Sequence, residues 1–153
     1  MQPLDPILVV EDEPDAITLL RHAFAKNDIA NPMVTVHSGD EAIAYLAGHA
    51  PYQDRSICPL PRFVLLDLKL PRCSGHEVLE WIRAQPGLRS LPVIVFTSSK
   101  ERSDVSRAYA AGANSYLVKP SSLGGLIELA AAFRNYWLLH NEPAPIPLPA
   151  PTP

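Results

Sequence analysis

The chain has 153 residues, 47% of them hydrophobic and 19% charged, with a formal net charge of −3. This length suits about one domain with a substantial core, and the slight negative charge gives no general electrostatic reason to bind nucleic acid or an anionic membrane. No stretch approaches the roughly 20 apolar residues of a membrane span, and no basic segment marks an export signal. Two cysteines cannot form a disulfide framework. We therefore expect a cytoplasmic protein.

Short apolar runs alternate with helix-like stretches along the whole chain. Five such pairs follow one another, each an apolar run and then a stretch with apolar residues at helical spacing: 7–10 and 14–27, 33–37 and 40–48, 63–66 and 76–85, 93–96 and 101–111, and 115–118 and 121–140. The second stretch ends at Gly48, which suits a glycine cap.

This alternation predicts an α/β protein with a doubly wound, open, parallel sheet. Strands that are apolar almost throughout are typical of sheets covered by helices on both faces. The right-handed crossover rule places successive helices on these faces. Sheets of this kind bind ligands beyond the carboxyl ends of their strands, so we look there for a site.

Two segments fall outside this pattern. The connection 49–61 is long and contains prolines, which makes it a candidate contact loop. The tail "PAPIPLPAPTP" cannot form a helix and is expected to sample polyproline II conformations. Its prolines stand at every second position and form no PxxP spacing, so we expect one domain over residues 1–140 and a flexible, solvated tail over 141–153.

Polar residues of complementary chemistry follow four of the apolar runs. Glu11 and Asp12 follow the first, Asp67 the third, Thr97 the fourth and Lys119 the fifth. Each alone has an ordinary explanation, such as a helix cap or a solvated strand end. In a parallel sheet, however, all five would meet at one edge.

Such a meeting of acids favours a bound cation. Two carboxylates about 5 Å apart repel by roughly 3 kcal/mol at an effective dielectric near 20. Mg²⁺ takes oxygen ligands and characteristically shares one or two carboxylates with phosphate oxygens. Together the groups suit phosphoryl transfer, with Asp67 as nucleophile, Lys119 neutralising phosphate oxygens and Thr97 donating a hydrogen bond to one of them.

The motifs "ILVVEDE", "VLLDLKLPRCSGHEVL", "PVIVFTSS" and "GANSYLVKP" carry a resemblance to the receiver domain of two-component response regulators. The resemblance covers residues 7–139 and implies a CheY-like, flavodoxin-like sheet of five strands in the order 2-1-3-4-5. It implies that Asp67 is the phosphoacceptor and that Lys119 and Thr97 assist the transfer.

The same resemblance implies a site for Mg²⁺ or Mn²⁺. Asp12 and Asp67 would bind the ion directly, Glu11 would act mostly through water, and the backbone carbonyl of Lys69 would complete the protein ligands. Thr97 and Tyr116 match the switch pair of the family. The bond between Lys119 and Pro120 is expected to be cis.

By resemblance, the chain is a stand-alone response regulator rather than a true enzyme. A sensor histidine kinase would donate the phosphoryl group to Asp67, and the chain would catalyse only its own phosphotransfer and dephosphorylation. Residues 49–61 and the extended final helix are similar to regulators that accompany bacterial phytochrome kinases. With no output domain, the chain would signal through its own surface.

Two other functions compete with this one. The first is a phosphorylation-independent, receiver-like binding module, which Mg²⁺-dependent beryllofluoride binding would distinguish. The second is a hydrolase or nucleotide-binding enzyme on a similar sheet. The sequence has no GxxxxGK[ST] loop after the first apolar run, and Asp67 does not begin a DxD motif, which argues against the second.

The final helix predicts a homodimer. Besides its core-facing positions, Ile127, Ala131 and Leu138 form a second apolar line, and a helix that is apolar on two sides usually has a second partner. We expect dimerisation through residues 121–139 and the neighbouring 101–118 face. The alternative is a helix wedged more deeply into its own domain.

Overall fold

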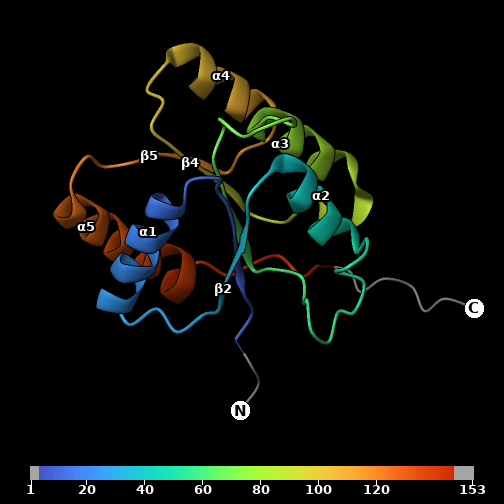
Figure 1. Ribbon diagram of the computed structural model, residues 1–153, viewed down its shortest axis with the longest axis horizontal. Coiled ribbons are helices and arrows are strands. Elements are labelled where there is room, and N and C mark those ends of the chain that lie inside the picture. The colour runs from blue at the N-terminus through green and yellow to red at the C-terminus, as the bar shows by residue number, and fades with distance from the viewer. Residues whose placement is uncertain (1–3, 147–153) are drawn as a thin grey trace, which may run out of the picture.

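A central sheet with helices on both faces forms the protein, as Figure 1 shows for the computed structural model, which describes residues 4–146. All strand pairs are parallel, and the strand order is β2-β1-β3-β4-β5. The strands are β1 (Ile7–Val10), β2 (Met33–Val36), β3 (Phe63–Leu66), β4 (Val93–Thr97) and β5 (Ser115–Val118). The predicted fold class and strand order are confirmed.

The helices follow the strands in the predicted alternation. They are α1 (Pro14–Lys26), α2 (Gly39–Ala47), α3 (Gly75–Ala84), the short 3₁₀ turn η1 (Pro86–Leu88), α4 (Arg102–Ala110), α5 (Leu123–Phe133) and the π-helical η2 (Arg134–His140). Three begin at a serine whose hydroxyl accepts an otherwise unpaired backbone N–H: Ser38, Ser74 and Ser122. Gly48 ends α2 with φ of 74°, as its predicted capping role requires.

Alternate residues of each central strand face opposite helical layers. On β1, Ile7 and Val9 belong to the cluster beneath α1 and α5, whereas Leu8 and Val10 belong to the cluster beneath α2 and α3. All four are at most 2% exposed. The sheet is therefore covered on both faces, which explains the nearly continuous apolar strands.

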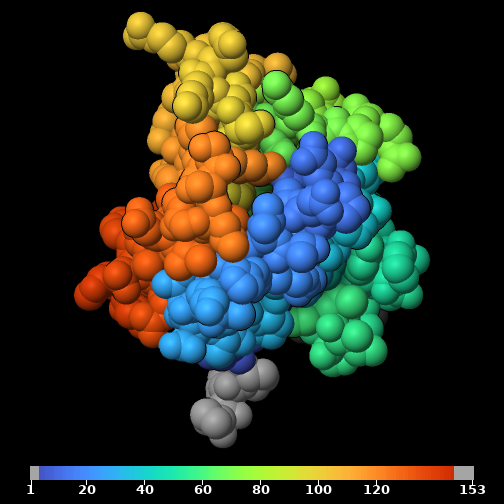
Figure 2. Space-filling view, turned by 60° about the vertical axis from the view of Figure 1, so that its left-hand side comes forward, coloured from blue at the N-terminus to red at the C-terminus, as the bar shows by residue number. Residues whose placement is uncertain are grey.

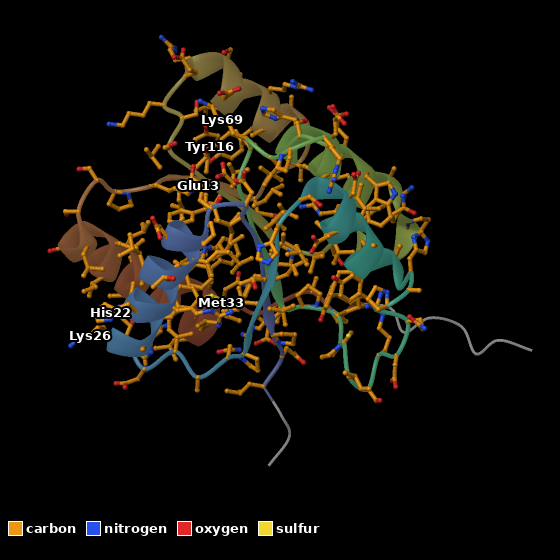
Figure 3. All side chains as sticks on the ribbon, in the orientation of Figure 1. Glu13, His22, Lys26, Met33, Lys69 and Tyr116 are labelled. Carbon is orange, nitrogen blue, oxygen red and sulfur yellow. The ribbon has the colours of Figure 1, made fainter. Side chains whose placement is uncertain are left out.

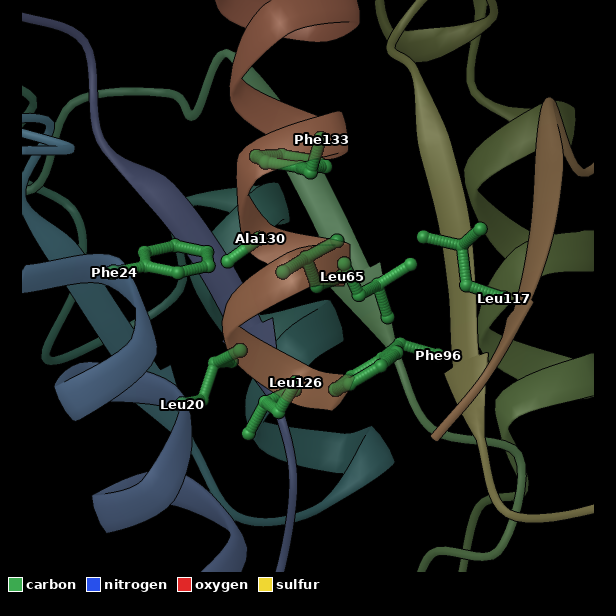
Figure 4. A pocket seen from close by; sticks show the side chains of 9 residues that line it. Leu20, Phe24, Leu65, Phe96, Leu117, Leu126, Ala130 and Phe133 are labelled. Carbon is green, nitrogen blue, oxygen red and sulfur yellow. The ribbon is translucent and has the colours of Figure 1, made fainter. Parts of the chain in front are cut away.

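Between α1, α5 and the sheet, packing leaves a cavity of about 20 Å³ (Figure 4). Its lining is apolar and includes Leu20, Phe24, Leu65, Phe96 and Leu126. A space of this size holds about one water, and an apolar lining keeps it dry. This is a packing gap in the core, too small to hold a ligand.

The connection 49–61 is fixed to the end of α2. The Arg55 guanidinium donates to the carbonyl oxygens of Tyr45 at 2.8 Å, Leu46 at 2.9 Å and Cys58 at 3.1 Å. The Tyr45 hydroxyl donates to the carbonyl of Pro59 at 2.7 Å. One cation thus donates to two carbonyls in the last turn of α2 and to one within the connection, and it holds the long connection against the domain.

Two expectations about the backbone and the final helix need correction. The bond between Lys119 and Pro120 is trans; among the described residues, the cis peptide bond is the one between Ala50 and Pro51. The trans form before proline is favoured by about 0.5–1 kcal/mol. Ile127 and Leu138 pack against the core cluster of their own domain, and the Asn27 side chain donates to the Ile127 carbonyl at 3.0 Å. These two residues are thus covered by the chain itself.

The expected lack of a membrane span and the expected solvated tail can both be compared with the structure. In the part of the chain that the structure describes, no helix is both long and apolar enough to cross a membrane. The predicted solvated tail begins as expected, without helix or strand at residues 141–146, but Ile146 packs against the α2–α3 side of the core. Residues 147–153 lie outside the described residues.

Candidate functional site

Backbone hydrogen bonds just past the strand ends position the predicted site residues. The amide of Glu11 donates to Val36 at 3.0 Å, that of Asp67 to Val10 at 3.1 Å, and that of Lys119 to Thr97 at 2.8 Å. Each bond joins two neighbouring strands one residue beyond the sheet. The three side chains therefore leave a rigid edge rather than a mobile loop.

This edge is the carboxyl end of the sheet, where the topology predicts a site. In Figure 3, Glu13, Lys69 and Tyr116, which follow or belong to three different strands, lie at one end of the molecule, and Met33 at the start of β2 lies toward the other. The loops after the neighbouring strands β1 and β3 diverge here, because they lead to α1 and α3 on opposite faces of the sheet. The break in strand order thus opens a crevice for the acidic side chains.

Three carboxylates meet at this edge. One oxygen of each of Glu11, Asp12 and Asp67 lies within 4.8 Å of the others. Glu11 is 4% exposed and Asp67 7%, whereas Asp12 is exposed. At such separations, two carboxylates repel by about 3 kcal/mol at an effective dielectric near 20, so the cluster needs positive charge.

Lys119 supplies part of this charge. Its ammonium donates to Glu11 Oε1 and, at 2.9 Å, to Asp67 Oδ2, and it lies 5.8 Å from the centre of the Phe96 ring. Burial lowers the pKa of Lys119, but its contacts with Glu11 and Asp67 outweigh burial, and the net effect is a raised pKa. Lys119 is therefore charged across the physiological range.

Burial has the opposite effect on the pKa of Glu11, the carboxylate that Lys119 contacts. It raises the pKa of Glu11 above the ordinary value, although the contact with Lys119 favours the charged form. One ammonium thus faces three carboxylates, two of them buried, in this crevice. The excess of negative charge and the absence of nitrogen or sulfur ligands make the cluster suitable for a hard divalent ion such as Mg²⁺ or Mn²⁺.

The geometry of the cluster fits such an ion after a small contraction. Oxygens that share one octahedral Mg²⁺ lie about 3–4 Å apart, since each bond measures about 2.0–2.1 Å. Asp12 is exposed and free to rotate inward. The Lys69 amide donates to Asp67 Oδ1 at 3.3 Å, which brings the backbone after β3 close to the same carboxylate.

Thr97 and Tyr116 meet through the loop after β4. Thr97 is fully buried, and its hydroxyl accepts a long hydrogen bond of 3.4 Å from the Ser99 amide. The Tyr116 hydroxyl donates to the carbonyl of that same Ser99 at 2.9 Å. Ser99 therefore links the two predicted switch residues.

A polar network that was not predicted from the sequence lies behind this link. The Ser99 hydroxyl donates to Asp104 at 2.6 Å, and the other carboxylate oxygen of Asp104 lies 3.4 Å from Nε2 of His76. These side chains come from the β4–α4 loop, α4 and α3, and no spacing in a single sequence brings them together. The hydrogen bond from Ser99, with help from His76, lowers the pKa of Asp104.

Comparison with known proteins gives a consistent result. The sequence profile of the response regulator receiver domain matches residues 7–131. The probable methanogenesis regulatory protein FilR2 of Methanothrix harundinacea is 40% identical over 136 residues, which cover 89% of this chain and 85% of FilR2. The response regulator Rcp1 of Synechocystis is 33% identical over 132 residues, with coverage of 86% and 88%.

Solved structures agree with the sequence comparison. The phosphorylated cyanobacterial phytochrome response regulator RcpA superposes with a TM-score of 0.85 at 32% identity, covering 92% of this chain and 98% of RcpA. The Mn²⁺-bound form of Rcp1 superposes with a TM-score of 0.83 at 30% identity, covering 92% and 99%. The chain therefore belongs to the family of response regulator receiver domains.

Proposed function

We propose that Asp67 accepts a phosphoryl group from the phosphohistidine of a sensor histidine kinase. The observation that carries this proposal is the Asp67 carboxylate held 2.9 Å from the Lys119 ammonium within the cluster that contains Glu11 and Asp12. The family membership supports the class of donor. An Asp67 oxygen attacks phosphorus, the P–N bond breaks, and the histidine nitrogen leaves with the electron pair.

The residues around Asp67 divide the work of this transfer. Lys119 neutralises charge on the transferred oxygens, and the buried Thr97 hydroxyl donates to one of them. Asp12, Asp67 and the Lys69 carbonyl hold Mg²⁺ or Mn²⁺, with Glu11 acting through water. The ion, when bound, offsets the charge of the acidic cluster and of the phosphate.

The signal leaves the site through the β4–α4 loop. Phosphorylation draws Thr97 toward the new phosphate, which moves Ser99 and the carbonyl that holds the Tyr116 hydroxyl. A shift of Tyr116 then changes the surface formed by α4, β5 and α5 between two states. The chain acts as a signalling protein, and its only catalysis is its own phosphotransfer and dephosphorylation.

The class of kinase and the cell compartment are also part of this proposal. RcpA is a cyanobacterial phytochrome response regulator, which supports a phytochrome kinase as the donor for this chain. We place the chain in the cytoplasm, acting without nucleic acid, in keeping with its net charge of −3. We also propose residues 1–140 as the functional domain and 141–153 as an appended segment.

A metal titration separates this function from that of a phosphorylation-independent module. With beryllofluoride, we expect the wild-type chain to bind Mg²⁺, and Asp12→Asn to weaken that binding about 10-fold or more, because loss of even an indirect metal partner costs 10–100-fold. Isothermal titration calorimetry measures both. Asp15→Asn, which changes an acid of α1 outside the cluster, serves as the matched control.

Two results would reject the metal site. In the first, the wild-type chain takes up no beryllofluoride in the presence of Mg²⁺, as a simple binding module would behave. In the second, Asp12→Asn and Asp15→Asn bind the ion with equal affinity. Either result leaves the acidic cluster without a role in phosphoryl chemistry.

We propose further that two copies associate through the face formed by residues 101–118 and the final helix. In Figure 2, the yellow and orange surface of α4 and β5 continues into the red surface of the final helix. Tyr109, Tyr136 and Leu139 are 50%, 58% and 58% exposed there. An open groove of about 350 Å³ lies between β5 and the final helix, beside the unpaired edge of the sheet.

Sedimentation tests this dimer. We expect the wild-type chain to sediment as a dimer at tens of micromolar and Tyr136→Asp to shift it to monomer, because a charge replaces an exposed aromatic in an apolar contact. Ile57→Asp is the control, since Ile57 is 75% exposed on the distant 49–61 connection. A wild-type chain that stays monomeric over this range would exclude the dimer.

A further inference from the structure

An open groove lies on the side of the molecule away from the acidic cluster. It is formed by the carboxyl end of α2, the 49–61 connection and the segment from α3 to η1, and its volume is about 720 Å³. Because these helices run antiparallel to the strands, their carboxyl ends lie at the amino edge of the sheet. The groove is therefore separate from the site of phosphoryl chemistry.

The groove has an apolar wall and a polar rim. Leu46, Leu60, Trp81 and Leu88 contribute the apolar side chains, and Gln53 and Gln85 contribute amides. A partly exposed tryptophan beside aliphatic residues and hydrogen-bond donors is the composition with which grooves bind proline-rich segments in the polyproline II conformation. The chain itself contains such a segment.

The described part of that segment reaches this side of the molecule. After η2 the chain runs, red in Figure 1, from the α5 side of the sheet past its amino edge to the region of α2. There Ile146 is half-buried and packs against the hydrophobic cluster that contains Leu46 and Leu88, against which Leu60 and Trp81 pack as well. All four of these residues also line the groove.

The sequence after Ile146 continues in the same chemistry. Leu148 is the next aliphatic residue of comparable size, and every second residue up to Pro153 is a proline. A residue before proline is restricted to extended conformations, so a proline-rich sequence loses little conformational entropy when it docks.

We propose that this groove is the intramolecular docking site of the chain's own proline-rich segment, with Ile146 and Leu148 as its apolar anchors. Prolines lack N–H groups and cannot pair the carbonyls of the segment, so these carbonyls accept from the rim amides of Gln53 and Gln85. The Gln85 amide donates one N–H to the Trp81 carbonyl and has a second N–H for the segment. Because the segment is covalently tethered to the domain, its effective concentration at the groove is in the millimolar range, which favours this segment over a free peptide.

Fluorescence of Trp81 tests the proposal. The chain has two tryptophans, so the experiment uses the Trp137→Phe background, in which Trp81 is the sole reporter. We expect the pair of substitutions Ile146→Ser and Leu148→Ser to shift Trp81 emission to the red and to raise its acrylamide quenching constant. Ala150→Ser, a change of similar chemistry in the same segment, should leave both unchanged.

A dilution series distinguishes the two possible sources of the segment. Docking within one chain keeps Trp81 equally protected over a roughly hundredfold dilution, since the effective concentration is set by the tether. Protection that is lost on dilution would show that a second copy supplies the segment and would overturn the proposal. Equal quenching in the double variant and the Ala150→Ser control would also overturn it. Neither readout depends on phosphorylation.

Discussion

Asp67→Asn should abolish Mg²⁺-dependent labelling of the chain by acetyl phosphate or by a cognate phosphorylated kinase. An asparagine amide cannot form the acyl phosphate, although it has nearly the same size and shape as the carboxylate. Its carbonyl oxygen can still accept from the Lys69 amide. We therefore expect a folded protein with no label, which intact-protein mass spectrometry detects directly.

The matched control is Asp40→Asn. Asp40 is an exposed acid in the first turn of α2, paired with the exposed Arg72, and lies outside the acidic cluster. Its substitution should leave labelling at the wild-type level, because exposed ion pairs contribute about 0–1 kcal/mol. A label that persists in Asp67→Asn would mean that another carboxylate accepts the phosphoryl group, and the assignment of Asp67 would fall.

The location of the site could be predicted because it depends only on strand direction. Once five apolar runs alternate with helices, parallel pairing brings Asp67, Lys119 and the acids after β1 to one edge without any knowledge of loops. The strand starts and the Gly48 cap were predictable for the same reason, since they follow from local patterns. Long-range packing does not enter these predictions.

The division of labour between the two neighbouring acids could not be read from sequence. Glu11 and Asp12 follow β1 where the chain leaves the sheet, so the alternation of the strand no longer fixes which side chain points inward. In the structure Glu11 is buried against Lys119, and Asp12 is exposed. The longer side chain thus reaches the ammonium, which only the geometry of the crevice reveals.

Contacts between segments distant in sequence could not be predicted either. The link from Ser99 through Asp104 to His76 joins three elements, and the packing of Ile146 depends on a hydrophobic cluster to which several strands and helices contribute. An extended, proline-rich tail has no periodicity that distinguishes a docked segment from a solvated one. Its partner surface is a tertiary feature.

Gly75 is a residue whose importance likewise appears only in three dimensions. It opens α3, and a Cβ atom at this position would lie 2.2 Å from the Asp67 carbonyl oxygen and 2.7 Å from Cα of Leu68. Its amide donates to the Leu68 carbonyl at 3.0 Å. The backbone that carries Asp67 thus packs directly against the first turn of α3, which leaves no room for a side chain.

Gly75→Ala should therefore destabilise the domain and disturb the phosphoacceptor together. The atoms that a methyl group would meet belong to the backbone and cannot rotate away, so α3 or the segment after β3 must move. Overpacking of this kind costs about 3 kcal/mol, which corresponds to a fall in melting temperature of roughly 6–12 °C for a chain of this size. Calorimetry measures the fall, and the rate of labelling by acetyl phosphate should decrease with it.

Gly124→Ala isolates the steric cause from the general effect of replacing glycine in a helix. Gly124 also lies in the first turn of its helix, α5, but a Cβ atom there would have no neighbour within 4 Å. Alanine favours helix over glycine by up to about 1 kcal/mol, so this control should keep or slightly raise the melting temperature. Equal melting temperatures in the two variants would show that the backbone at Asp67 yields freely to α3. The site would then be softer than its hydrogen bonds to β1 imply.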